Sequence, residues 1–321
     1  MNWADMFPIL GEDMLEDYEA TATAAEKAEL EEWFGVARVI PSGRTRPGPS
    51  QGHPHIAAAT VFWKHVGADD PDLPVPTRER LVHARRMGLI KRFDPWESYI
   101  EPMLVAGPEQ IARNPDVEFR AYLASDLEFL AGDLVEAGWE VHLMKSPSIR
   151  YSPGGFWRFL ALEDAALVTM LDADRVALSD TEIERTRVMH RLGLGLWRVP
   201  GYYNHEPVNE VRYRPILGGH FGAMGGIPAK KLMQAYVWHA RRGSMPLVVN
   251  LPGGRQTPLM FAKWPGYGYD EIFQLVGLYP WLVEGGTLTF VPRDSRSFFL
   301  PADIDYVNHA NPNSEVAYFD G

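Results

Sequence analysis

The sequence predicts an α/β protein in which helices flank a mostly parallel, Rossmann-like central sheet. From residue 56 onward, short apolar runs typical of buried strands alternate with amphipathic stretches of helical spacing. Strands and helices that alternate in this way are usually joined by right-handed crossovers, which makes neighbouring strands parallel. The chain has 321 residues, 46% of them hydrophobic, so it can bury a large core.

Shifts in composition divide the chain into three regions. Residues 1–55 are expected to form a helical N-terminal extension and linker, because 12–34 are rich in Glu and Ala with apolar residues at loosely helical spacing. The linker, 40–55, reads "IPSGRTRPGPSQGHPH" and is rich in turn-forming residues. Residues 56–178 form an α/β region, and 179–321 complete the same domain.

The expected elements follow in order. In the α/β region we expect strands at 56–64, 117–125, 140–145 and 165–174, and helices at 75–89, 107–113, 126–138 and 154–162. In the remainder we expect a helix at 179–193, a strand at 194–199, a strand and glycine-rich loop at 214–227, helices at 228–242 and 269–283, a strand at 287–294 and a loop-rich tail at 295–321. The first of these helices begins with Ser179 followed by Glu182, the pattern of a capping box.

Charge and composition exclude several classes of protein. The net charge of −11 argues against a globally basic nucleic-acid binder, although a local basic groove stays open. The chain has no cysteine, which excludes disulfides, thiolate zinc sites and cysteine nucleophiles, so a metal would need oxygen or imidazole ligands. There is no basic leader and no apolar stretch near the roughly 18–20 residues of a membrane helix, which predicts a soluble, cytoplasmic protein.

Two carboxylates lie at the end of the predicted strand at 165–174, in the segment "VTMLDADR". Ligands of parallel sheets bind at the carboxyl ends of the strands, where Asp172 and Asp174 are expected. Two negative charges at such a short separation repel each other, and a divalent cation would compensate them. A helix cap or a turn is the alternative explanation of this D-x-D pattern.

A second candidate segment is dense in glycine: Gly218, Gly219, Gly222, Gly225 and Gly226 lie within nine residues. Without a Cβ, such backbone can approach a ligand closely. The segment matches neither the phosphate-binding loop nor the dinucleotide fingerprint. A sharp β-bend at a sheet edge remains the alternative.

Acidic and imidazole side chains supply the remaining candidates. Asp270 and Glu271 open a helix; one carboxylate suits the helix dipole, and the other is free to act as a general base. The histidines form no metal-binding motif, although His205, His220 and His309 remain possible third ligands beside the aspartates.

Four motifs in this order resemble a family of bacterial and viral glycosyltransferase-like proteins with the GT-A fold: "SPGGFWRFLALED", "VTMLDADR", "RPILGGHFGAMGG" and "YGYDEIF". The family pattern has a P-G-x-x-W-R-F helix, a strand ending in D-A-D-S-R, an I-L-G-G-x-W-G-x-x-G segment and a later D-Q-x-F helix. Order and spacing hold over residues 117–280. This chain departs from the pattern at Arg175, Phe221 and Glu271, and reads "RVPGYYNHEP" where relatives often have an R-D-H-P-like segment.

The resemblance implies roles for individual residues. It makes 56–178 the nucleotide-sugar-binding region and 179–321 the acceptor side, with Mn²⁺ or Mg²⁺ held by Asp172 and Asp174. The implied donor contacts, besides these two aspartates, are Trp63, Lys64, Trp157 and Arg158. The implied acceptor contacts are Gly218, Gly219 and His220, and the implied base is Asp270 or Glu271.

The sequence therefore predicts a metal-dependent glycosyltransferase that moves a sugar from a nucleoside diphosphate sugar to a hydroxyl, with inversion and retention both open. The acceptor is a glycan, a small molecule or a hydroxymethylated base in phage DNA. Basic runs at 78–92 and 239–243 would serve the DNA acceptor, although solvated helix faces explain them equally well. A non-catalytic nucleotide- or carbohydrate-binding protein on a GT-A scaffold is the alternative.

Overall fold

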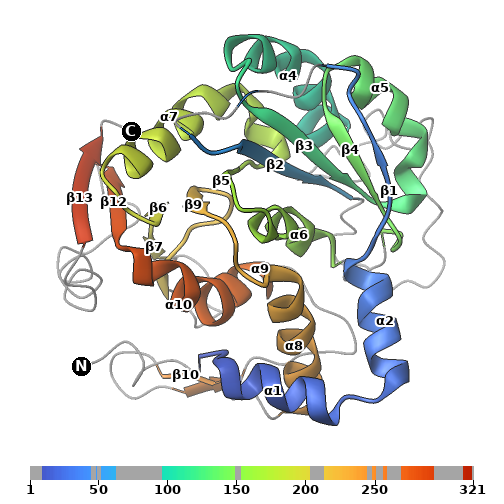
Figure 1. Ribbon diagram of the computed structural model, residues 1–321, viewed down its shortest axis with the longest axis vertical. Coiled ribbons are helices and arrows are strands. Elements are labelled where there is room, and N and C mark those ends of the chain that lie inside the picture. Colours follow the sequence, from blue (N-terminus) through green and yellow to red (C-terminus); the bar gives the residue numbers. More distant parts are fainter. Residues whose placement is uncertain are drawn as a thin grey trace.

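The computed structural model describes residues 9–44, 48, 52–62, 96–148, 153–202, 213–243, 248–250, 256–258, 269–292 and 314–319. Within them lies a nine-stranded sheet with the strand order β1-β4-β3-β2-β5-β9-β6-β12-β13 (Figure 1). Its strands are β1 (Val36–Ile40), β2 (His55–Val61), β3 (Glu118–Leu123), β4 (Glu140–Met144), β5 (Leu167–Met170), β6 (Leu196–Arg198), β9 (Phe221–Met224), β12 (Thr287–Pro292) and β13 (Ser314–Phe319). Two short antiparallel ribbons pair β7 (Gly201–Tyr202) with β8 (Tyr213–Arg214) and β10 (Val248–Asn250) with β11 (Gln256–Pro258).

The sheet is mixed but mostly parallel. Parallel pairs join β4 to β3, β3 to β2, β2 to β5, β6 to β12 and β12 to β13. Strand β9 runs antiparallel between β5 and β6, and β1 runs antiparallel to β4 at the edge. The predicted α/β class with a mostly parallel, helix-flanked sheet is thus confirmed.

Helices cover both faces of the sheet. The α-helices are α1 (Glu12–Thr21), α2 (Ala24–Phe34), α4 (Glu101–Arg113), α5 (Ala131–Glu136), α6 (Gly154–Trp157), α7 (Ser179–Arg191), α8 (Ala229–Arg242), α9 (Tyr269–Phe273) and α10 (Tyr279–Leu282). Short 3-10 helices span Ser125–Leu130, Arg158–Glu163, Ala173–Leu178 and Val283–Gly285, and π-helical turns span Trp96–Ile100 and Gln274–Leu278. Helices α4, α5 and α7 form one layer, and α6 lies on the opposite face, with α8, α1 and α2 packed beyond it (Figure 1).

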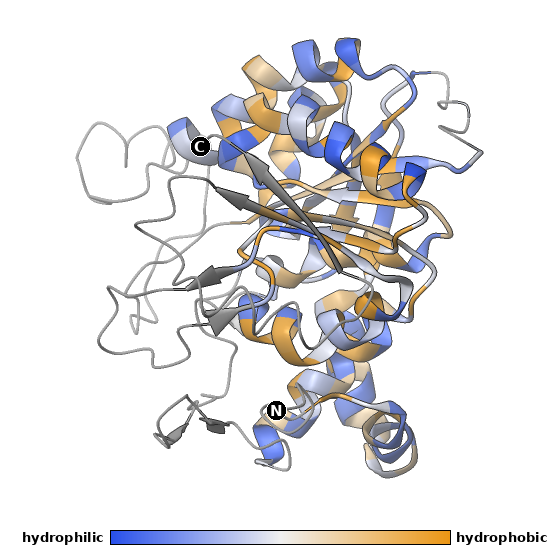
Figure 2. Cartoon of the chain, turned by 90° about the vertical axis from the view of Figure 1, so that its left-hand side faces the viewer, coloured by the Kyte–Doolittle hydropathy of each residue, from blue (hydrophilic) through white to orange (hydrophobic). Residues whose placement is uncertain are grey.

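Aromatic side chains fill the space between the sheet and the second helical layer. The Phe156 ring contacts those of Phe34, Tyr236 and Phe273, with centroids 5.9, 6.1 and 5.4 Å away. All four side chains are buried. Figure 2 shows hydrophobic residues along the central strands and on the inner sides of helices. The apolar residues of the "GGFWRF" motif therefore build the core.

Most expected elements exist, and several differ from expectation. Strand β1, at 36–40, joins the sheet from the region 1–55, which was expected to form a helical extension and a linker. Helix α4 begins at Glu101, earlier than the predicted 107, because Pro102 is tolerated in its first turn. The glycine-dense segment contains strand β9 in the middle of the sheet, so neither a bend at the sheet edge nor a simple loop describes it. The tail contributes β13, which pairs with β12. The helix predicted at 75–89 lies outside the described residues.

A further difference is the capping box predicted at Ser179, which is wrong. The chain enters α7 directly from the 3-10 helix Ala173–Leu178, so Ser179 already has helical dihedral angles. Its hydroxyl donates to the carbonyl oxygen of Val176 at 2.6 Å, while the Glu182 carboxylate pairs with His220. A complete capping box does occur at α2, between Thr23 and Glu26.

Close packing explains Gly222 in β9. A Cβ at this position would lie 2.3 Å from both Thr186 Oγ1 and Trp197 Nε1, and 2.9 Å from the carbonyl oxygen of Val168. We expect Gly222→Ala to lower the free energy of unfolding by about 3 kcal/mol, because rigid neighbours must move. Urea unfolding measures this change. Gly132→Ala is the control, since nothing lies within 4 Å of its Cβ and alanine favours helix α5; equal losses would contradict the packing argument.

Candidate active site

Arg158 is the centre of a buried cluster at the carboxyl edge of the sheet. It opens the 3-10 helix Arg158–Glu163 directly after α6, and its side chain is 6% exposed. Its Nη1 donates to Asp172 Oδ1, and its Nη2 lies 3.5 Å from Asp270 Oδ2. One guanidinium therefore joins the segment after β5 to helix α9.

The glycine-dense segment contacts the same cluster. The backbone N–H of Gly219 donates to Asp172 Oδ2 at 3.3 Å. A Cβ on Gly219 would lie 2.6 Å from Asp172 Oδ1 and 2.9 Å from Arg158 Nη1, so a side chain here would separate the ion pair. Gly218 has a positive φ of 51°, and its carbonyl accepts a hydrogen bond of 2.9 Å from Gln274 Nε2.

Helix α9 brings its acidic residues to this edge. A Cβ on Gly155 would lie 3.3 Å from Asp270 Cγ, so α6 and α9 meet where glycine leaves room. Glu271 Oε1 would be 3.9 Å from a Cβ on Gly218. Gln274, one turn further, starts a π-helical turn and is fully buried. Such turns often occur at functional sites.

Electrostatics keep Arg158 charged. Burial by itself lowers the pKa of its guanidinium, but the carboxylates of Asp172 and Asp270 outweigh burial and hold that pKa above its ordinary value. The two carboxylates are themselves partly exposed, at 29% and 23%. The cluster is a fixed ion network that opens toward solvent on its carboxylate side.

A second pair of contacts lies beside this cluster. Asp174 and Arg175 are exposed on the 3-10 helix Ala173–Leu178, which is kinked at Arg175. Arg175 Nη1 contacts His220 Nε2, and His220 Nδ1 lies 3.0 Å from Glu182 Oε1. Burial raises the pKa of the Glu182 carboxyl, and the hydrogen bond to His220 opposes this rise.

The structure thus brings together most of the predicted site. Arg158, Asp172, Asp270 and the glycine pair meet directly, with Glu271 beside them. Trp157 differs: it is fully buried, and its indole N–H donates to the carbonyl of Trp33 at 2.8 Å, so its ring packs in the core. The positions of Trp63, Lys64, His205 and His309 lie outside the described residues.

Sequence reasoning missed Gln274 and the involvement of Glu182 and Arg175. Gln274 follows Asp270 by four residues, and that helical spacing is the one signal that pointed to it. Glu182 was assigned to a helix cap, and Arg175 was noted only as a departure from the family pattern. Their partners come from distant parts of the chain, which no local pattern reveals.

The donor chemistry at the D-x-D segment fits a hard cation. Both oxygens of Asp172 accept hydrogen bonds, and Asp174 is the more exposed residue of the two. Mg²⁺ and Mn²⁺ are commonly held by one or two carboxylates together with substrate phosphates and water. Asp174 is therefore the better placed of the two predicted ligands.

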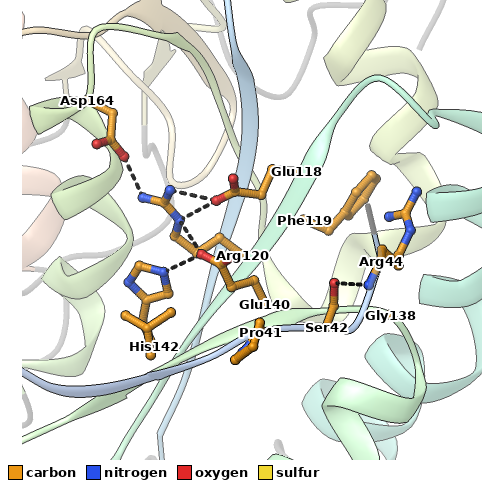
Figure 3. A pocket seen from close by; sticks show the side chains of 11 residues that line it. Pro41, Ser42, Arg44, Glu118, Phe119, Arg120, Gly138, Glu140, His142 and Asp164 are labelled. Atoms are coloured by element: carbon orange, nitrogen blue, oxygen red, sulfur yellow. Dashed lines mark hydrogen bonds and ion pairs between the residues drawn. The ribbon is translucent and has the colours of Figure 1, made fainter. Parts of the chain in front are cut away.

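Across the described residues, one group of three possible ligands has its donor atoms within 4.8 Å of one another: Glu118, Glu140 and His142. It lies at the opposite, amino edge of β3 and β4, in a pocket of about 510 Å³ (Figure 3). Arg120 stands among these groups and donates to Glu118 at 2.6 Å and to Asp164 at 2.6 Å. The guanidinium already offsets the acidic charge there, so these contacts describe an internal ion network.

The described basic run is also internally paired. Arg241 donates to Glu29 at 3.0 and 3.1 Å, and Arg242 donates to Glu26 at 2.6 Å, both on α2. These arginines hold α8 against α2 and present little free charge to a phosphate backbone. The run at 78–92 lies outside the described residues.

Comparisons of this chain with protein-family models, with curated proteins and with solved structures find no match. The described helices include none that is both long and apolar enough to cross a membrane.

Proposed function

We propose that the protein is a metal-dependent glycosyltransferase with a GT-A-like fold, which transfers a sugar from a nucleoside diphosphate sugar to an acceptor hydroxyl. One observation carries the proposal: the segments around Arg158, Asp172, Gly219 and Asp270, which are far apart in sequence, meet around one buried guanidinium. They meet at the carboxyl edge of the sheet, where ligands of α/β proteins bind.

Each side chain has a role consistent with its contacts. Asp174, an exposed residue, would hold Mn²⁺ or Mg²⁺ through its carboxylate. When bound, such a cation offsets negative charge on the departing nucleoside diphosphate. Arg158 fixes Asp172 and Asp270 in place, because a guanidinium bonds two carboxylates with defined geometry. Gly218 and Gly219 allow the acceptor-side turn to approach these groups.

We propose a glycan or a small molecule as the acceptor. Duplex DNA needs a row of free cationic side chains to meet its phosphates. The arginines of 239–243 are paired with α2, which removes one of the two basic runs that supported a DNA acceptor.

Release of nucleoside diphosphate from a panel of nucleotide sugars, with Mn²⁺ and then with chelator, tests the proposal. We expect turnover that chelation abolishes, and a fall of about 100-fold in Asp174→Asn, the loss of roughly 2.7 kcal/mol of transition-state stabilisation. Asp13→Asn is the control, since Asp13 is an exposed carboxylate in the first turn of α1.

Two results would contradict the proposal. Turnover that survives both chelation and Asp174→Asn would show that no cation at this position takes part. Tight binding of a nucleotide sugar without release of diphosphate would indicate the non-catalytic binding protein instead.

A further inference from the structure

His220 and Glu182 form a dyad beside the Arg158 cluster. The Glu182 side chain is 5% exposed and that of His220 is 12% exposed, and Nδ1 of the imidazole lies 3.0 Å from the carboxylate oxygen. His220 directly follows Gly219, whose backbone N–H bonds Asp172. The dyad is therefore next in sequence to a residue that contacts Asp172 in the Arg158 cluster.

The contacts on both ring nitrogens specify one tautomer. A carboxylate only accepts hydrogen bonds, so Nδ1 carries the hydrogen that Glu182 accepts. A guanidinium only donates, so Nε2, which contacts Arg175, presents its lone pair. Two independent neighbours thus favour the tautomer that has its hydrogen on Nδ1 and the lone pair of Nε2 directed at an exposed arginine.

This arrangement has the parts of a general base. A buried carboxylate on Nδ1 orients the ring and stabilises the imidazolium that forms when Nε2 takes a proton. Arg175 is exposed and lies at the kink of its 3-10 helix, so an acceptor hydroxyl can replace it on Nε2 without disturbing the core. Of the two bases that the family resemblance implies, Asp270 and Glu271, Asp270 is already committed to an ion pair with Arg158.

We propose that His220, positioned by Glu182, is the general base of the transfer reaction; this rests on the proposed glycosyltransferase function. The acceptor O–H bond breaks and its proton moves to Nε2. The oxygen forms a bond to the anomeric carbon as the bond from that carbon to the diphosphate oxygen breaks, and the nucleoside diphosphate leaves with that electron pair. One direct displacement inverts the configuration at the anomeric carbon. His220 is the catalytic residue, and Glu182 is a positioning residue.

Other charged groups near the dyad shape its pH dependence. They are Arg175 on the 3-10 helix, Arg185 on α7 and Asp172 after β5. Glu182 is the one carboxylate in hydrogen-bond contact with the ring in the described structure. Removing its charge should therefore lower the pH of the acidic limb of the rate profile, because the imidazolium loses its stabilising partner.

The test compares pH profiles of kcat/KM for the full chain and its variants with Mn²⁺ and the best donor of the panel. We expect His220→Gln to lower kcat about 100-fold or more with the donor KM within threefold. Glu182→Gln should move the acidic limb of the kcat/KM profile to lower pH. Glu182→Asp should recover part of the rate that Glu182→Gln loses. Asp270→Asn should leave the acidic limb at the same pH, even if its overall rate falls. The anomeric configuration of the product, read by NMR, should be inverted relative to the donor.

The outcomes separate this proposal from the proposed function. A wild-type protein that releases no nucleoside diphosphate overturns both. If the wild type is active but His220→Gln keeps the wild-type rate, only the role of His220 is overturned. The same holds if the acidic limb of the pH profile is lost in Asp270→Asn and not in the His220 variant. The ¹⁵N chemical shifts of the His220 imidazole add a measurement that needs no activity, and a hydrogen found on Nε2 at neutral pH would overturn the proposed dyad. Circular dichroism checks that each variant is folded.

Discussion

Replacing Arg158 with Met is expected to lower the free energy of unfolding by about 3 kcal/mol, near the lower end of the range for breaking a buried ion pair. Met has a similar length and no charge, so Asp172 and Asp270 lose the cation that compensates them. Both carboxylates keep some contact with water, at 29% and 23% exposed, which limits the cost. Urea unfolding at neutral pH measures the change.

Arg113→Met is the matched control. Arg113 also joins two carboxylates, Glu109 and Asp180, but its side chain is 57% exposed. Exposed pairs contribute well under about 1 kcal/mol each, so we expect a small loss. If both variants lost the same stability, the Arg158 network would contribute no more than a surface pair, and its function would lie entirely in positioning.

Acid is expected to destabilise the protein through His55. This side chain is 2% exposed, and burial, aided by the positive charge of Arg187, lowers its pKa to about 3. The unfolded chain binds a proton below about pH 6.5, whereas the native state stays neutral until about pH 3, so stability rises with pH across this window. The contribution approaches about 1.4 kcal/mol per pH unit once the unfolded histidine is protonated, or roughly 2.3 kcal/mol between pH 6.5 and 4.5.

The contacts of His55 explain why it stays neutral. Its Nε2 lies 2.9 Å from Thr169 Oγ1, and Thr169 lies 2.7 Å from Thr186 Oγ1, which also accepts the Trp197 indole N–H at 2.7 Å. Nδ1 is buried with no hydrogen-bond partner within the described part of the chain. A second proton on the ring would therefore be buried unpaired.

Unfolding free energies of the wild type and His55→Gln at pH 6.5, 5.5 and 4.5 test this prediction. Glutamine is neutral at all three pH values. The difference in free energy of unfolding between the two proteins should therefore change with pH by the amount expected for one proton that only the unfolded wild type binds. If the free energies of unfolding of the two proteins changed equally with pH, His55 would take its proton in the folded state and another group would govern acid sensitivity.

Much of the order of elements follows from local pattern. The strands predicted at 56–64, 117–125, 140–145 and 165–174 are β2, β3, β4 and β5 in the structure, because strands buried in a mostly parallel sheet are rich in apolar side chains. Asp172 lies two residues after the end of β5, so its place at the carboxyl edge follows from the same pattern. The register between strands could not be predicted from the sequence: Arg120 lies opposite Glu140 only because β3 and β4 pair in space.

The sequence by itself determined the α/β class, the position of the acidic pair after a buried strand and the need for glycine near it, because these depend on spacing along the chain. Only the tertiary structure decided which groups meet: that Arg158 bonds Asp172 and Asp270, that Trp157 packs in the core, and that Glu182 holds His220. Contacts between distant segments depend on how the layers pack, and packing is a property of the whole chain.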